Sequence, residues 1–290
     1  MDTVSPDPSI SPAELAARLG RADAPLVLDV RRAAAFAAGD RLVAGTQRCD
    51  PVDLPAFARE HAPREAVVYC VYGHEVSRDA AQALRDAGWN ARYLAGGFEG
   101  GQDGVDAPQD IVRWRSKAPP RLRKRPDLGV TGERPSRWIT RARPKIDRAA
   151  CPWLIRRFID PGAQFFYVPE DQVFGQARQL GAVAFDIEGA PISHEWERCS
   201  FDALLRAFEL QAPGLDTLAA IVRGADTSRP ALAPQSAGLL ALSLGLSRLH
   251  AQDDQAMRAA AEPLYDALYE WCRAGQDERH SWQAHAVAAA

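Results

Sequence analysis

The chain has 290 residues, of which 47% are hydrophobic and 25% charged, and its net charge is −3 at pH 7. This length allows two domains with hydrophobic cores, whereas the near-neutral charge of the whole chain says little about its partners. The five cysteines are widely spaced and include no CxxC pair, which argues against a disulfide scaffold and favours reduced thiols.

The sequence contains no pattern typical of export or of membrane insertion. Its first residues lack the basic and apolar regions of a secretory signal. The longest apolar stretch, residues 237–249, is shorter than a bilayer-spanning helix and includes two serines. We therefore expect a cytoplasmic protein without a membrane partner.

Residues 1–104 predict a first domain in which helices alternate with short buried strands. A capping box at Ser11 and Glu14, with proline at the first helical position, begins the first helix. The other expected helices are 33–38 and 77–87, and the expected strands are 26–30, 66–69 and 91–94. This order predicts an α/β fold with a mostly parallel sheet and helices on both faces.

Residues 105–134 change in composition, and we interpret them as a mobile basic linker. Glycine, proline, aspartate and arginine dominate there. From Ile111 to Lys145 there are twelve lysines and arginines but only two acids. Such a segment would bind nucleic-acid phosphates in a salt-dependent way, although a charged linker is more often simply solvated.

Residues 135–278 predict a second domain that is mainly helical, of α+β type, and residues 279–290 predict a loose tail. The expected strands are 138–140 and 164–168. Apolar residues at three- and four-residue spacing predict helices at 201–208, 214–222, 237–249 and 263–273. Another helix is expected at 152–159, with Pro152 as its first residue.

Cys70 is the candidate nucleophile of the first domain. It stands at the end of the strand 66–69, before a short glycine-containing loop and a helix. Backbone N–H groups in such a loop, and the positive end of the helix dipole, favour a thiolate. A thiolate at this place can attack a substrate and accept a transferred anionic group.

Three motifs of the first domain resemble a single-domain rhodanese, which is a sulfurtransferase. They are LDVR at 28–31, the CxxG loop that begins at Cys70, and YLAGGF at 93–98. The resemblance implies that Cys70 accepts a sulfane sulfur from a small-molecule donor as a persulfide and passes it to a thiol acceptor, without a cofactor. The implied cradle for the persulfide consists of Val71, Tyr72, Gly73, His74, Glu75, Val76 and Ser77.

The loop departs from the family pattern at two positions. Glu75 stands where rhodanese loops often have a basic residue, and a carboxylate facing the pocket would oppose an anionic donor. Ser77 lies one position later than expected, while His74 would offset Glu75 or donate a proton. The alternative is an inactive rhodanese fold in which Cys70 is a buried core thiol. Asp29 and Arg31 are interpreted as a structural pair.

A basic block of the second domain is a candidate oxyanion site. Arg141, Lys145 and Arg148 precede the helix expected to begin at Pro152, and cations at a helix N-terminus bind anions. The alternative is a solvated basic face. Cys151, directly before Pro152, is either a thiol of low pKa at a helix start or a core cysteine.

His194, Cys199 and Asp226 are candidate metal ligands. Imidazole and thiolate groups suit zinc or iron, and the carboxylate would be a third ligand from a distant segment. The alternative is a hydrogen-bonded core histidine beside an inert thiol.

The second domain resembles the chromate-resistance protein B family. The resemblance rests on residues 138–141, 144–161, 194–202, 221–226, 234–239 and 264–269. It implies a role in chromate resistance, with chromate as a candidate ligand. We expect a chromate-resistance protein in which a sulfurtransferase domain carries persulfide on Cys70 and the second domain binds an oxyanion or a metal. The alternatives are a chromate-responsive DNA-binding regulator and a catalytically inactive scaffold.

Overall fold

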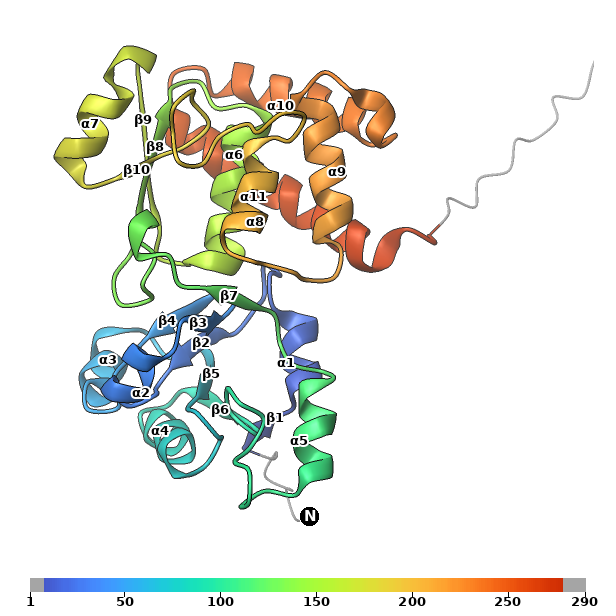
Figure 1. Cartoon of the computed structure of the whole chain (residues 1–290). Helices are drawn as coiled ribbons and strands as arrows, with labels where there is room; N and C mark the ends of the chain where they lie inside the picture. Colours follow the sequence, from blue (N-terminus) through green and yellow to red (C-terminus); the bar gives the residue numbers. More distant parts are fainter. Residues whose placement is uncertain (1–7, 279–290) are drawn as a thin grey trace, which may run out of the picture.

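The computed structural model describes residues 8–278. The tail expected at 279–290 therefore lies outside the described residues. Figure 1 shows two regions in contact, one that includes residues 8–123 and another built from the C-terminal half of the chain. No helix among residues 8–278 is long and apolar enough to cross a membrane.

A five-stranded, all-parallel sheet forms the centre of the first region (Figure 1). Its spatial order is β1 (Ser9–Ile10), β6 (Asn90–Leu94), β5 (Glu65–Tyr69), β2 (Leu26–Asp29) and β4 (Thr46–Arg48). The central strands β2 and β5 are largely apolar and buried, as expected when helices cover both faces of a parallel sheet. The predicted α/β architecture is confirmed.

Helices cover both faces of this sheet. One face packs on α3 (Leu54–Glu60) and α4 (Glu75–Asp86), and the other on α1 (Pro12–Arg18), α2 (Ala33–Ala38) and α5 (Pro108–Arg115). Half of the predicted capping box is present at α1: the Ser11 hydroxyl accepts a hydrogen bond of 3.2 Å from the Glu14 amide, while the Glu14 carboxylate accepts from Arg92 at 2.7 Å. The helix predicted at 33–38 has these bounds in the structure.

The prediction of a mobile linker at residues 105–134 is wrong. This segment forms α5, the strand β7 (Arg121–Arg123) and the short helix η1 (Pro126–Leu128), and β7 pairs antiparallel with β3 (Arg41–Val43). Trp114, Leu122 and Leu128 are buried. The apolar residues of this segment stand singly between basic ones. The composition of the segment is therefore dominated by its charge and does not reveal that these few apolar side chains pack in the core.

The second region has a three-stranded parallel sheet with most of its helices on one face. The sheet order is β10 (Val183–Ala184), β8 (Arg137–Arg141) and β9 (Gln164–Val168). On one face lies α7 (Val173–Leu180), and on the other are α6 (Ile146–Leu154), α8 (Ser200–Ala207), α9 (Leu215–Asp226), α10 (Ser236–Leu249) and α11 (Asp254–Glu270). The predicted mainly helical α+β region is confirmed.

The sequence analysis predicted that a helix begins at Pro152, and this prediction is wrong. Helix α6 begins six residues earlier, at Ile146, and continues through Pro152 into the π-helical turn η2 (Ile155–Ile159). A proline inside a helix removes one backbone hydrogen bond, which the well-packed surroundings of α6 tolerate because its residues 149–155 are all buried. Cys151 therefore lies within the helix instead of before it.

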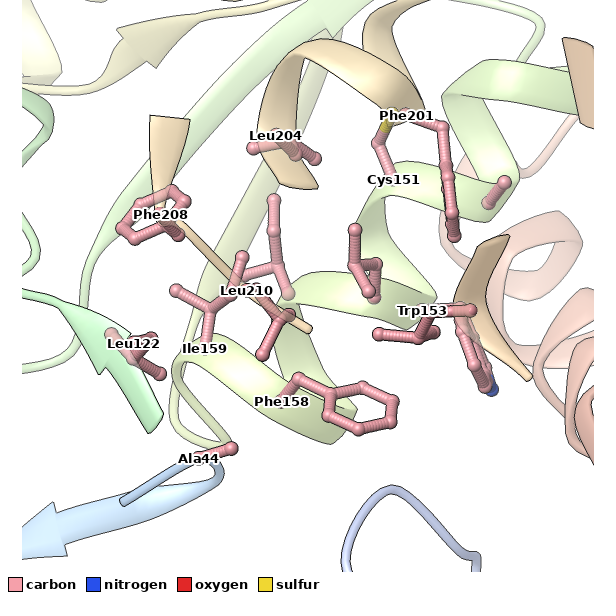
Figure 2. Packing of buried hydrophobic residues seen from close by; sticks show 14 of the residues in the cluster. Ala44, Leu122, Cys151, Trp153, Phe158, Ile159, Phe201, Leu204, Phe208 and Leu210 are labelled. Carbon is pink, nitrogen blue, oxygen red and sulfur yellow. The ribbon is translucent and has the colours of Figure 1, made fainter. Parts of the chain in front are cut away.

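The two regions share one hydrophobic cluster. Figure 2 shows Ala44 and Leu122 facing Phe158, Ile159 and Phe208. Backbone hydrogen bonds cross the same boundary, from the Gly45 amide to the Phe158 carbonyl oxygen and from the Arg123 amide to the Phe208 carbonyl oxygen, at 2.6 and 2.9 Å. These contacts fix the second region directly on the first.

Candidate functional site

Cys70 directly follows β5, and helix α4 begins five residues later at Glu75. The cysteine is 5% exposed, and its Sγ atom lies 3.2 Å from the hydroxyl oxygen of Ser77. Ser77 is fully buried in the first turn of α4. The structure thus brings together the predicted nucleophile and the predicted hydroxyl donor.

The loop between Cys70 and α4 is anchored by hydrogen bonds to its carbonyl oxygens, whereas its own backbone N–H groups form none within residues 8–278. The amides of Phe98 and Glu99 donate to the carbonyl oxygens of Cys70 and Val71 at 2.9 and 2.8 Å. Gly73 has a φ of 75°, and a Cβ atom there would lie 2.6 Å from the Gly96 amide nitrogen. Within residues 8–278, the backbone N–H groups of residues 71–77 form no hydrogen bond, as is usual for the first turn of a helix and the loop before it.

Glu75 and His74 take positions that change the electrostatics expected for this loop. Glu75 is exposed on the first turn of α4 and does not line the adjacent pocket. His74 instead points its Nε2 atom at Asp106, 2.9 Å away. The amide of Gln102 and the His74 ring hold the pKa of Asp106 below its usual value. The expected repulsion between Glu75 and an anionic donor is therefore reduced by distance and solvent.

A pocket of about 370 Å³ opens beside the loop. The loop contributes Tyr72, Gly73 and His74 to its wall. Basic and aromatic side chains also line the pocket, namely Arg78, Tyr93, Arg113, Trp114 and Lys117. Residues 108–117, which the sequence analysis assigned to a linker, therefore form part of this pocket.

Asp29 and Arg31 form a buried ion pair at the end of β2. The Arg31 guanidinium donates to Asp29 at 2.6 to 3.0 Å, and the Tyr69 hydroxyl donates to the same carboxylate at 2.9 Å. Both residues are almost fully buried. This geometry agrees with the structural role that the sequence analysis assigned to the pair.

A second cluster surrounds His194 in the C-terminal region. Its Nε2 atom lies 2.9 Å from an Asp226 oxygen, 3.3 Å from an Asp186 oxygen and 3.6 Å from an Asp147 oxygen. Hydrogen bonds to Asp186 and Asp226 raise the pKa of His194 to about 10. Burial and the two neighbouring carboxylates raise the pKa of Asp147. The predicted candidates His194 and Asp226 are thus brought together.

Cys199, the third predicted ligand, and Cys151 lie outside this cluster. The Cys199 thiol points to Asp202, with 3.5 Å between sulfur and oxygen, and the Cys151 thiol donates to Asp147 at 3.3 Å. Burial raises the pKa of both thiols well above its ordinary value. The hypothesis of a low-pKa thiol at Cys151 is therefore wrong, because the sulfur is enclosed in the middle of α6 and next to a carboxylate.

The three candidate oxyanion ligands do not converge on an open site. Arg148 and Arg141 lie 3.3 and 3.6 Å from Asp186, and Lys145 is exposed before the first residue of α6. The two guanidinium groups therefore already neutralise a buried carboxylate.

Sequence reasoning missed Asp147 and Asp186 as functional residues. Asp147 is the one acid inside the basic and apolar block 141–159, and Asp186 comes two residues after the strand β10. An isolated acid at the start of a buried helix was the available signal.

Comparisons with known proteins match two separate segments of the chain to two families. Residues 11–103 match the family model of the rhodanese-like domain, and residues 138–272 match that of the ChrB C-terminal domain. Protein ChrB of Cupriavidus metallidurans is 34% identical over 153 residues, which are 49% of this chain and 45% of that protein. The chain thus spans less than half the length of this curated relative.

Two solved structures are similar in sequence to part of the chain. A rhodanese homologue of Thermus thermophilus is 30% identical and covers 31% of this chain and 94% of its own, with a TM-score of 0.25. A full-length protein of Lactobacillus plantarum is 32% identical and covers 26% of this chain and 63% of its own, with a TM-score of 0.24.

Proposed function

Because this chain joins a rhodanese-like domain to a ChrB C-terminal domain, we propose that it is a chromate-resistance protein that carries a persulfide on Cys70 and binds a metal ion or an oxyanion in its second domain. The first domain acts as a sulfurtransferase with a small-molecule sulfur donor and a thiol acceptor. The observation that carries the proposal is the Cys70 sulfur, which lies 3.2 Å from the Ser77 hydroxyl at the start of a loop whose amides form no hydrogen bond within residues 8–278.

Sulfur transfer at this site takes two displacements. The Cys70 thiolate attacks the sulfane sulfur of thiosulfate, a sulfur–sulfur bond forms, and sulfite leaves with the electron pair of the broken bond. An acceptor thiolate then attacks the outer sulfur and releases the Cys70 thiolate. The amides of residues 71–77 and the Ser77 hydroxyl stabilise the negative charge of the outer sulfur in the intermediate.

The alternative of an inert core thiol rests on the burial of Cys70 among apolar side chains. Burial alone suits both interpretations, because the attacked sulfur of a persulfide also needs protection from water. The contact between the Cys70 sulfur and the Ser77 hydroxyl at the start of α4 favours transfer, since a helix N-terminus stabilises negative charge.

The positive wall of the adjacent pocket supports an acceptor that carries negative charge. Arg78, Arg113 and Lys117 outnumber the two acids of the pocket, Asp106 and Asp110. A thiol compound bearing carboxylates fits this charge distribution.

Intact mass spectrometry after incubation with thiosulfate tests the proposal. We expect the full chain to gain the mass of one sulfur atom and to lose it on addition of a thiol. Cys70→Ser should abolish the gain, and Cys49→Ser, which changes another buried thiol of the same cluster, should leave it intact. A chain that never gains sulfur, with thiosulfate or another sulfane donor, would refute the sulfurtransferase function.

The chromate role has a separate test in cells. Expression of the chain in a chromate-sensitive bacterium should raise the tolerated chromate concentration, and Cys70→Ser should show how much of this depends on sulfur transfer. Unchanged tolerance would refute the chromate role while leaving sulfur transfer on Cys70 standing.

The DNA-binding alternative gains no specific support from the geometry. Several cations of the basic segment contact partners within the chain, since Arg125 pairs with Asp127, Arg123 with Glu209, and the Lys124 amine donates to the Phe36 carbonyl oxygen. Charges that are neutralised internally contribute little to phosphate binding.

A further inference from the structure

We propose that Asp147, Asp186, His194 and Asp226 form a site for one divalent metal ion of the Mn²⁺ type. The inference rests on the metal branch of the function proposed for the second domain and is independent of sulfur transfer on Cys70. It replaces the ligand set expected from the sequence, because two buried aspartates take the place of Cys199.

The four groups come from four separate parts of the chain. Asp147 lies in the first turn of α6, Asp186 follows β10, His194 lies in the loop before α8, and Asp226 is the last residue of α9. One ligand atom each from Asp147, Asp186 and His194 lies within 4.8 Å of the others. Convergence of donors from distant segments on one point is typical of a binding site.

The distances within the cluster are those of atoms that share an ion. Ligands with metal bonds of ~2.1 Å lie ~3.0 Å apart at octahedral angles and ~3.4 Å apart at tetrahedral angles. The His194 nitrogen lies 2.9, 3.3 and 3.6 Å from its three carboxylate oxygens. One ligand atom each of Asp147, Asp186 and His194 lies within 4.8 Å of the others, and Asp226 adjoins them through its 2.9 Å contact with His194.

Hydrogen bonding alone accounts poorly for this arrangement. The Nε2 atom of an imidazolium carries one hydrogen, which can be directed well at one oxygen only. Here three carboxylates from different elements face the same nitrogen. A divalent ion would satisfy all of them, with His194 neutral and bound through Nε2.

The two buried carboxylates are held in fixed orientations by their surroundings. The amides of Ser200 and Phe201 donate to Asp147 at 2.6 and 3.0 Å. The Ser200 hydroxyl donates to Asp186 at 2.9 Å, and the Arg148 guanidinium lies 3.3 Å from the same side chain. The amide and hydroxyl donors fix the orientation of the two carboxylates.

The donor set indicates the class of ion. Three carboxylates and one imidazole are hard or borderline donors, which suit Mn²⁺ and Fe²⁺. The Cys199 thiol points to Asp202 and the Cys151 thiol donates to Asp147, so both sulfur atoms are engaged with carboxylates and a sulfur-rich zinc site is disfavoured.

The site has a route to solvent on the side of His194. The His194 side chain is 42% exposed, and Trp196, two residues further along the same loop, is fully exposed. An ion can therefore reach the buried carboxylates without unfolding of the core.

Titration of the metal-free full-length chain with MnCl₂ tests the proposal, with free Mn²⁺ followed by electron paramagnetic resonance. We expect one ion bound per chain, release of protons on binding, and a higher melting temperature with Mn²⁺. His194→Gln and Asp226→Asn should each weaken binding by ~10-fold or more. They change the two less buried ligands, so circular dichroism should show a native fold.

The matched controls are His250→Gln and Asp216→Asn. His250 lies at the end of α10, and Asp216 is an exposed residue of α9, the helix that carries Asp226. Both variants should bind Mn²⁺ like the parent chain. Absence of binding and proton release in the parent chain, or equal affinity in the ligand variants, would overturn the site. The persulfide test on the same protein samples would report separately on Cys70.

Discussion

The hydroxyl of Ser77 lies between two acceptors in the candidate transfer site. Its oxygen is 3.2 Å from the Cys70 sulfur and 3.3 Å from the His74 carbonyl oxygen, so its one hydrogen serves either of them at a time. A sulfur that carries negative charge is the stronger acceptor. We therefore expect the hydroxyl to donate to the sulfur in the thiolate and persulfide states.

Ser77→Ala should slow thiosulfate-to-cyanide sulfur transfer by ~10-fold, which corresponds to about 1.4 kcal/mol of lost stabilisation. Steady-state rates of the variant and the parent chain measure the effect. Ser116→Ala, which changes an exposed serine, should have the parent rate. Equal rates for Ser77→Ala and the parent would show that the amides alone hold the charge.

At the scale of elements, α5 combines a structural and a site role. Trp114 packs in the core and donates from its ring nitrogen to the Ala95 carbonyl oxygen at 2.7 Å, while Arg113 lines the pocket. The helix thereby fixes the turn 94–97, on which the Cys70 loop rests. Packing of α5 and the geometry of the loop are coupled for this reason.

Trp114→Ala should lower the free energy of unfolding by ~3–5 kcal/mol, because it removes a large buried ring and leaves a carbonyl oxygen unpaired. Urea unfolding followed by circular dichroism measures this change. Val112→Ala, on the exposed face of the same helix, should change stability by less than ~0.5 kcal/mol. Similar small effects for both variants would favour a loosely attached segment.

A charge cluster joins α1 to the sheet and gives a pH dependence. Glu65 on β5 accepts from Arg18 on α1 at 2.8 Å and from Arg92 on β6 at 3.3 Å. These guanidinium groups, Arg18 first, lower the pKa of Glu65 below 4.5. The folded state therefore favours the ionised carboxylate, and its contribution to stability is present above pH 4.5 and lost as the pH falls through the lowered value.

Glu65→Gln should accordingly reduce the free energy of unfolding at pH 7 by ~0.5–1 kcal/mol, a value kept small by partial exposure of the pair. The difference from the parent chain should shrink when urea unfolding is repeated near pH 3. Glu60→Gln, at an exposed position, should show no such pH-dependent difference. A deficit that persists unchanged at low pH would assign the effect to packing.

Local sequence patterns predicted most of the helices and strands. The remaining ones form through pairing between segments that are far apart in the sequence. The capped helix at Pro12–Arg18 and the strand at Gln164–Val168 have strong local signals, and both are present. The strands β3 and β7 are three residues long and exist because they pair with each other across about eighty residues. Such short segments carry too few residues for a periodic pattern.

At the scale of the whole molecule, the two regions are parts of one folding unit. Gly20 of the first region lies against the Phe158 ring of the second, where a Cβ atom would approach to 2.0 Å. Leu122 and Phe208 belong to the same cluster. We therefore expect both regions to unfold together.

Phe158→Ala should lower the free energy of unfolding by ~3–5 kcal/mol and should destabilise both regions equally. Calorimetry should show a single transition in the parent chain and in the variant. Phe174→Ala, on the partly exposed face of α7, is the control and should have a smaller effect. Two separate transitions in the parent chain would contradict a shared core.

The candidate sites differ in how far the sequence predicts them. Cys70 and Ser77 are seven residues apart and belong to one loop and helix, so a local motif identifies them. The cluster around His194 draws on residues from 147 to 226, and its members meet only through tertiary folding. The sequence alone therefore does not identify its buried aspartates as site residues, because only the three-dimensional arrangement of the elements brings them together.

The continuous core at the boundary between the regions restricts how such a gene can be altered. Recombination that cut the chain between Leu122 and Phe158 would expose Leu122 on one product and Phe158 on the other. Newly exposed apolar faces of this kind promote aggregation. If either region were fused to an unrelated domain, the apolar residues exposed at the former boundary would have to be replaced by polar ones. We therefore expect the two regions to be inherited together.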